Sequence, residues 1–398
     1  MSKRLKYLPI CIGLACSSLA NGVEVQINGF GSMVGGKTIS HENLPDIPAV
    51  PPFYPGETGR TSVYHADFAN DGIYDDQLSF FPDTNIGLQF RFDLGDGLSA
   101  TTQLMGFGAS EFHTKLDWAY VGWQINSEFS VKAGRQRMPL FLYSDSLDVA
   151  YGYHWIRGPM EVYNSSLSNF TGVNLTYETV LADTSVRVQV WGGESEGFDP
   201  FIDVEQSYKD LIAITVDGEY KDLSFHLMYG LTKYGEEGAS RTLPSGVVED
   251  QGLDNGVNSD LASIGLRYDF EKFFVLGEVT YWSSVDTYWP DPGGLGANWG
   301  GGWYVSSGVH IGDFTPHITY GSILIVLDES ASIFQGFATG EQDMTNEGLT
   351  LGLRWDMHPH AALKFEYYSS KDKSDDLILL GGETFTVDVV TMGIDIAY

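Results

Sequence analysis

The feature that most constrains the fold of this chain is a period-two alternation of apolar and polar residues, which recurs from residue 23 to the last residue. In 349–357, for example, every second residue is apolar, and the residues between them are polar, charged or glycine. Segments 84–94 and 223–229 alternate in the same way. Because successive side chains of a strand point to opposite faces, this pattern predicts half-buried β-strands.

Sixteen segments carry this alternation, and short and long links mostly take turns between them. The short links hold two to four residues, whereas the link after the fifth segment covers about 138–169. Tight turns at one end, long loops at the other and an even strand number are the layout of a closed membrane barrel. The predicted strands are 23–37, 84–94, 98–110, 116–125, 129–137, 170–179, 185–194, 210–220, 223–233, 260–270, 273–283, 303–311, 314–327, 348–357, 361–370 and 387–398.

The charge pattern favours lipid as the solvent of the apolar face. That face carries almost no Asp, Glu, Lys or Arg, and an Arg or Lys facing the bilayer midplane would cost roughly 2–4 kcal/mol. Aromatic residues lie near strand ends, as in the interfacial girdles of such barrels. We therefore expect an all-β fold, a 16-stranded antiparallel transmembrane β-barrel. A soluble exported sandwich, with the aromatics in its core, is the alternative.

The N-terminus has the pattern of a secretory signal peptide. Lys3, Arg4 and Lys6 precede an apolar run, and a small-residue cleavage site ends at Ala20, before Asn21. This predicts a signal peptide over 1–20 and a mature chain over 21–398. Both cysteines of the chain lie in the leader, so the exported protein needs no disulfide.

Composition excludes several other classes. The chain has 22 Lys and Arg against 53 Asp and Glu, a net charge of -31, whereas a nucleic-acid partner requires a basic surface. Charged residues make up only 19% and hydrophobic residues 43%, which argues against a disordered acidic chain. Segment 31–38 matches a phosphate-binding loop, but the proline-rich stretch after it cannot form the helix that such a loop needs. No catalytic motif, metal site or cofactor is predicted.

Several motifs in order resemble the Gram-negative outer-membrane porin family. They are the opening strand 25–31, the Gly134-Arg135-Gln136 motif that closes the fifth strand, the long loop after it, and the terminal aromatic Tyr398. The resemblance implies a general diffusion porin in the outer membrane, in contact with lipid and lipopolysaccharide. It also implies sixteen strands, a homotrimer, passage of small hydrophilic solutes and ions, and recognition of Tyr398 by the outer-membrane insertion machinery.

The loop at 138–169 is rich in aromatic and apolar residues, which predicts that it packs against the inner wall and narrows the lumen. An exterior cap in contact with lipopolysaccharide or a partner subunit is the alternative. The resemblance implies that acids of this loop face a basic cluster on the wall. The constriction acids it indicates are Asp145, Asp148 and Glu161, with Arg157 in the same loop, and the pore-wall residue it indicates is Arg135. The other pore-wall candidates are Lys132 and Arg187, which alternation places on the lumen face, and Asn85.

Two observations weaken the expected basic cluster. If Phe129, Val131 and Ala133 face lipid, alternation places Lys132 inside and Arg135 outside, unless a bulge resets the parity. Asn85 stands where many general porins have an inward arginine. Both departures favour a channel that leans toward cations. Further lumen candidates are Asp217, Glu219, Glu278, Lys364, Glu366 and Asp395.

Three strands repeat an Arg–aromatic–Asp phrase just before a short turn, which places both charges on the lumen face. They form either a charged ring at the periplasmic mouth or a structural rim of salt bridges. The residues are Arg91, Asp93, Arg267, Asp269, Arg354 and Asp356.

The resulting hypothesis is a porin that forms a water-filled channel for passive diffusion. One alternative is a substrate-specific channel with a saturable site, in which Tyr143, Tyr151, Tyr153 and Trp155 stack on a sugar or another small solute. A second alternative is an outer-membrane enzyme on a narrower barrel of about twelve strands, with a packed lumen.

Overall fold

The computed structural model describes residues 23–42, 74, 76–163, 168–199, 204–237, 240–242, 248–250, 257–284, 297–327, 342–373 and 385–398. The predicted signal peptide and the cleavage site at Ala20 and Asn21 lie outside these residues.

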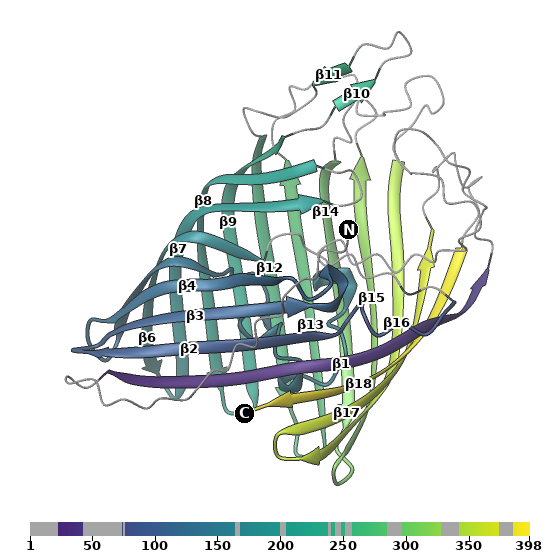
Figure 1. The fold of residues 1–398 in the computed structure, drawn as a ribbon, viewed down its shortest axis with the longest axis horizontal. Coiled ribbons are helices and arrows are strands. Elements are labelled where there is room, and N and C mark those ends of the chain that lie inside the picture. Colours follow the sequence, from purple (N-terminus) through teal and green to yellow (C-terminus); the bar gives the residue numbers. More distant parts are fainter. Residues whose placement is uncertain are drawn as a thin grey trace, which may run out of the picture.

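Within the described residues, sixteen strands form one closed antiparallel barrel (Figure 1). Each strand pairs with the barrel strands before and after it in the chain, and β1 closes the ring by pairing with β18. The barrel strands are β1 (Glu24–Glu42), β2 (Asn85–Gly95), β3 (Leu98–Phe107), β4 (Thr114–Gln124), β5 (Phe129–Arg137), β6 (Asn169–Leu181), β7 (Thr184–Asp199), β8 (Val204–Tyr220), β9 (Leu223–Glu237), β12 (Val257–Asp269), β13 (Phe273–Ser284), β14 (Ala297–Val309), β15 (Phe314–Leu327), β16 (Gln342–His358), β17 (Ala361–Asp372) and β18 (Phe385–Ala397).

The sixteen predicted strands are confirmed, and the closed ring excludes the sandwich alternative. Several strands run further than predicted at the end that carries the long loops. Strand β16, for example, starts at Gln342 where the alternation begins only at 348. Ladder hydrogen bonds can continue there without an apolar face. A two-stranded sheet, β10 (Ser240–Thr242) with β11 (Val248–Asp250), lies in a segment that was predicted to be loop.

The two faces of the barrel wall differ in chemistry, as the alternation predicted. Along the outer face, Ile86, Val121, Val173, Leu266, Val305 and Ile318 are each 50–58% exposed. This surface suits hydrocarbon, because a folded protein rarely leaves so much contiguous apolar area to water. None of the described helices is long and apolar enough to cross a bilayer. Buried polar side chains on the inner face include Thr101, Gln103, Thr215, Ser263, Thr319 and Thr350.

The last residue completes the closure of the barrel. The Tyr398 amide donates to the Gly29 carbonyl at 2.9 Å, and the Gly29 amide donates to the Tyr398 carbonyl at 3.2 Å. A Cβ atom on Gly29 would lie 2.3 Å from the Tyr398 ring, so the glycine leaves the space that the terminal aromatic occupies.

Three glycines form a cross-strand row where the loop leaves the wall. Gly134 of β5 pairs with Gly172 of β6, which pairs with Gly193 of β7. Gly134 has a φ of 131°, which L side chains rarely adopt, and a Cβ on it would lie 2.3 Å from a backbone carbonyl. This backbone conformation and the close approach both require glycine, which explains the glycine of the Gly134-Arg135-Gln136 motif.

The substitution Gly172→Ala is expected to lower the free energy of unfolding by about 1–3 kcal/mol, because its methyl group has no room. The added Cβ would lie 2.0 Å from the backbone carbonyl oxygen of Gly192. Gly106→Ala is the matched control, since its nearest neighbours would lie 3.5 Å away. Urea unfolding in lipid vesicles measures both variants. Equal midpoints would show that the row is not tightly packed.

Candidate functional site

The candidate site is built by the loop that follows β5, here called the inner loop (residues 138–163). It contains two 3-10 turns, η2 (Ser144–Ser146) and η3 (Ala150–Gly152), and the short helix α1 (Met160–Tyr163). Most of its contacts are with inward-facing side chains of β6 to β9 and of β12 to β17. The inner loop therefore packs on inward-facing residues of the wall.

The first part of the inner loop is fixed by an apolar cluster. Met138 and Leu140 are both buried against the wall of β6 to β9. The Trp191 indole N–H donates to Thr215 Oγ1 at 3.0 Å, and the Thr215 hydroxyl donates to the Pro139 carbonyl at 3.1 Å. The wall side of this cluster consists of Phe170, Trp191, Leu211, Ala213 and Met228.

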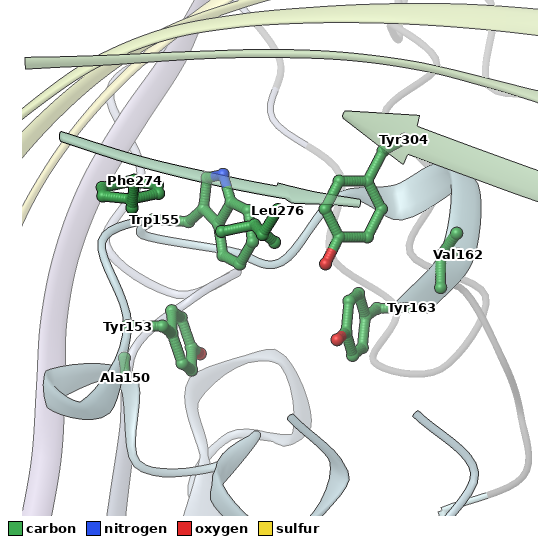
Figure 2. Close-up of a cluster of buried hydrophobic side chains, with 8 residues drawn as sticks. All are labelled: Ala150, Tyr153, Trp155, Val162, Tyr163, Phe274, Leu276 and Tyr304. Atoms are coloured by element: carbon green, nitrogen blue, oxygen red, sulfur yellow. The ribbon is translucent and has the colours of Figure 1, made fainter. Parts of the chain in front are cut away.

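The second part is fixed by a larger aromatic cluster, shown in Figure 2. Trp155 is 1% exposed, its ring stands edge-on to Tyr304 at 5.6 Å, and its N–H donates to Thr319 Oγ1 at 2.8 Å. The loop residues Ala150, Tyr153, Trp155, Val162 and Tyr163 pack here on Phe274, Leu276 and Tyr304 of the wall.

Wall cations satisfy the carbonyl groups of the inner loop. The Lys364 ammonium donates to the carbonyls of Ala150 at 2.6 Å and Trp155 at 2.5 Å, and it pairs with Asp395 at 2.6 Å. Arg354 donates to the carbonyls of Tyr151 at 2.8 Å and Tyr153 at 2.6 Å. Irregular backbone needs such partners once it leaves water.

At the start of the loop, the Leu140 carbonyl is likewise satisfied by side chains of the wall. It faces His226 Nε2 at 3.0 Å and also accepts a hydrogen bond from the Ser263 hydroxyl. The other ring nitrogen of His226 faces an Asp217 carboxylate oxygen at 2.7 Å. Both neighbours of the imidazole are acceptors, so the arrangement suits a ring that donates from both nitrogens.

Wall carboxylates satisfy amide groups of the loop. Glu278 accepts from the Leu142 amide at 2.7 Å and from the Tyr304 hydroxyl at 2.7 Å, and it also accepts from the Tyr163 hydroxyl. Glu366 accepts from the Ile156 amide at 2.8 Å. Between these anchors, burial lowers the pKa of His154 well below its usual range, with a further contribution from nearby His317.

Glu161 of α1 occupies a notch formed by three inward glycines. A Cβ on Gly302 would lie 1.5 Å from the Glu161 carbonyl oxygen, and one on Gly348 would lie 1.8 Å from its carboxylate. Gly321, between them, approaches the Glu161 side chain in the same way. Glu161 is 4% exposed and accepts a hydrogen bond from the Tyr368 hydroxyl at 3.0 Å. Within the described residues no cation forms an ion pair with it.

Docking of α1 is expected to weaken as the pH rises. Burial raises the pKa of the Glu161 carboxyl, and hydrogen bonds to its own backbone and Tyr368 offset only part of this. The neutral form therefore stabilises docking fully below the ordinary pKa, and this stability is lost as the pH rises through the folded-state value. Hydrogen exchange of the α1 amides between pH 5 and 9, corrected for intrinsic rates, measures it.

Glu161→Gln is the control, because the amide keeps the shape of the neutral carboxyl but does not titrate. Its corrected exchange is expected to stay flat with pH. A wild-type profile as flat as that of Glu161→Gln would contradict the assignment.

The substitution Lys364→Met is expected to loosen the 150–156 segment and to lower the free energy of unfolding by about 3–5 kcal/mol, because it leaves Asp395 buried without its counter-charge. Hydrogen exchange of that segment and urea unfolding measure the two effects. Lys364→Met with Asp395→Asn is expected to recover part of the stability but not the protection of the segment. Recovery of both would mean that Lys364 does not hold the loop.

The structure gives three of the predicted constriction residues another role. Asp148 forms an ion pair with Arg137 and is largely covered. Arg157 Nε donates to Asp83 Oδ1 at 2.7 Å. Glu161 is buried in its notch and does not face the open lumen. The expectation that these three line the aperture is therefore corrected, because each is held inside the loop–wall packing.

Asp145 is the predicted constriction acid that remains open to the lumen, with a side chain 69% exposed. It lies 3.8 Å from Arg187 of β7, which also donates to Glu178 at 2.9 Å. Lys132 faces inward, with its ammonium 5.3 Å from the Tyr120 ring. Asn85 also faces inward, since it pairs with the buried Ser32.

Arg135 lies on the outer face of the barrel, so its assignment to the pore wall by resemblance is wrong. It pairs with Ala119 of β4 and Thr171 of β6, and directly opposed residues share a face. Its neighbour Gln136 pairs with the inward Phe170. No bulge resets β5, and the parity count from the sequence gave the correct face.

Two of the three Arg–Asp phrases form ion pairs within their own strand. Arg267 contacts Asp269 at 2.6 Å and Arg354 contacts Asp356 at 2.7 Å. Arg91 and Asp93 are exposed, and the Asp93 carboxylate accepts from the Gly95 amide at 2.9 Å. Arg267 also donates to the Tyr143 hydroxyl at 2.5 Å, so this rim is connected to the inner loop. Sequence reasoning missed that connection.

Sequence reasoning also missed Arg137, which ends β5 and joins Asp148 to the wall, with Asp117 3.8 Å away. Alternation did assign Glu278, Lys364 and Glu366 to the lumen face, but nothing local in the sequence marks them as loop anchors. Within the described residues, no group of three or more His, Cys, Asp or Glu side chains could hold a metal.

Comparison with known proteins finds this fold in solved structures of outer-membrane proteins. A loop L8 deletion mutant of OmpT, an outer membrane protein of Vibrio cholerae, matches with a TM-score of 0.58 at 10% identity, over 94% of this chain and 99% of that one. The outer membrane channel DcaP of Acinetobacter baumannii matches with 0.57 at 11%, over 96% and 99%.

An anion-selective porin from Comamonas acidovorans matches with a TM-score of 0.54 at 15% identity, over 95% of this chain and 100% of that one. A scan of family models and a search of curated proteins each found no match. At these identities the likeness establishes a shared fold.

Proposed function

We propose that this chain is a porin of a Gram-negative outer membrane, which passes small hydrophilic solutes and ions passively through a water-filled channel. The observation that carries the proposal is a closed sixteen-stranded barrel with an apolar outer face, a polar inner face and a loop fixed along the inner wall. Strand number sets barrel width, and sixteen strands leave an aqueous lumen. Solved structures with this fold include channels and porins.

Two alternatives lose support. The enzyme alternative expected about twelve strands and a packed lumen. The sugar-stacking alternative needs exposed aromatic faces, but Tyr153 and Trp155 are buried in the loop–wall cluster and Tyr143 is partly buried against it. Tyr151 lies outside this cluster, with the Arg354 guanidinium 5.1 Å from its ring. Solute passage in this proposal breaks no bond and uses no cofactor, so the barrel acts by exclusion and by its field.

The proposed channel leans toward cations. Lys364, Arg354 and Arg267, which face the lumen, are each engaged by carboxylates and by the inner loop. Asp145 projects from the loop with most of its side chain exposed. Asp145, with Arg187 3.8 Å away, therefore adds exposed acidic charge to the path, in keeping with the net charge of -31 for the chain.

The proposal includes a homotrimer embedded in lipid and lipopolysaccharide. One of the solved structures with this fold, in-vitro folded OmpT of Vibrio cholerae, is a trimer form. The exposed Tyr398 at the closing seam is the proposed signal for the outer-membrane insertion machinery.

Single-channel recording in a planar bilayer under a salt gradient tests the function. We expect large ohmic steps and a cation-selective reversal potential. Asp145→Asn is expected to lower the cation-to-anion permeability ratio roughly twofold to threefold, as one unit charge near an aqueous path would. Asp96→Asn, in the exposed turn after β2, makes the same charge change away from the loop and is expected to have little effect. Absence of conductance would overturn the proposal.

A further inference from the structure

One row of polar and small residues interrupts the apolar outer face. Register places Thr102, Ala119, Arg135, Thr171 and Glu194 directly beside one another across β3 to β7. The same row continues outward-facing into β2 and β1, where Phe90 pairs with Thr102 and the exposed Ile27 pairs with Phe90. The five residues from Thr102 on β3 to Glu194 on β7 are here called the outer polar row.

The residues around the outer polar row are apolar and suit contact with lipid, but the charged residues of the row do not. Val121 and Val173, two residues further along the same face, are 50% and 52% exposed. The side chains of Arg135 and Glu194 form neither an ion pair nor a hydrogen bond within the part of the chain that the structure describes. An Arg on this face costs roughly 2–4 kcal/mol at the bilayer midplane, so a partner that satisfies it would be stabilising.

The outer polar row contains two opposite charges that can complement an identical row on another copy. Arg135 and Glu194 flank Thr171 on adjacent strands, so they stand about 9–10 Å apart at the usual strand spacing. Two opposite charges side by side on one surface can each meet the other charge of an identical surface, as in a closed ring of copies. The remaining members, Thr102, Ala119 and Thr171, are small enough to let two walls approach closely.

We propose that the outer polar row is the contact surface for a second copy of this chain, in which Arg135 of one copy pairs with Glu194 of the next. The proposal rests on the proposed membrane location, since only lipid makes the lone charges costly. It extends the expected homotrimer by locating the contact and by giving Arg135 a role outside the pore. A lipid phosphate would satisfy Arg135 but would be repelled by Glu194, so a surface with both charges fits better.

Charge reversal and charge exchange test the pairing. Arg135→Glu and Glu194→Arg are each expected to raise the dissociation constant of the oligomer at least tenfold, measured by sedimentation in detergent. The double variant restores opposite charges and is expected to associate like the wild type. Arg91→Glu, an identical change on the exposed lumen side of β2, is the matched control and is expected to leave association unchanged.

Arg135→Leu is the control for misfolding, because it places an apolar residue on an apolar face. It is expected to fold, as judged by the gel shift on heating, and to associate more weakly. The inference is overturned if the wild type is monomeric, if neither reversal changes association, or if the double variant fails to recover it. Conductance separates the two proposals. Variants that dissociate but stay folded are expected to conduct if the channel function is right and the contact is only structural. Wild-type oligomers without conductance would refute the function alone.

Discussion

The structure depends on one constraint, which is that a backbone group removed from water needs another hydrogen-bond partner. The barrel wall meets it by pairing every strand with its neighbours and by sealing β1 to β18 through Gly29 and Tyr398. The inner loop has no strand ladder, so inward side chains of the wall form the hydrogen bonds to its backbone groups. Each such bond contributes only about 1 kcal/mol, but leaving a buried group unpaired costs about 1–3 kcal/mol, which explains why so many wall side chains are committed to it.

That commitment also decides which charges remain for solutes. Lys364 and Arg354 face the lumen, as a basic wall cluster would, but their donors are directed at loop carbonyls. Glu161, an acid that would face such a cluster, lies instead in a glycine notch. The field of the channel is therefore set by the few charges left over after the loop has been held, of which Asp145 is the most exposed acid on the loop.

Much of the fold was predictable from the sequence, because period two is a local property and sixteen repetitions of it specify a barrel. Parity even gave the correct outward face for Arg135, against the resemblance. The partners of the inner loop could not be predicted, since Lys364 joins residues more than 200 positions away. The register shift of β4 against Gln103 and Leu104, beside Asp117, was equally hidden, because a bulge depends on both strands.

The anchors of the inner loop are spread along the chain as far as its last strand. The inner loop is made before any strand from β6 onward, yet its last anchors are Lys364 on β17 and, through it, Asp395 on β18. The loop can acquire its final position only when the C-terminal strands have joined the wall. A wall that lacks β17 and β18 therefore cannot complete the anchoring of the loop, although β6 to β9 already hold its first part.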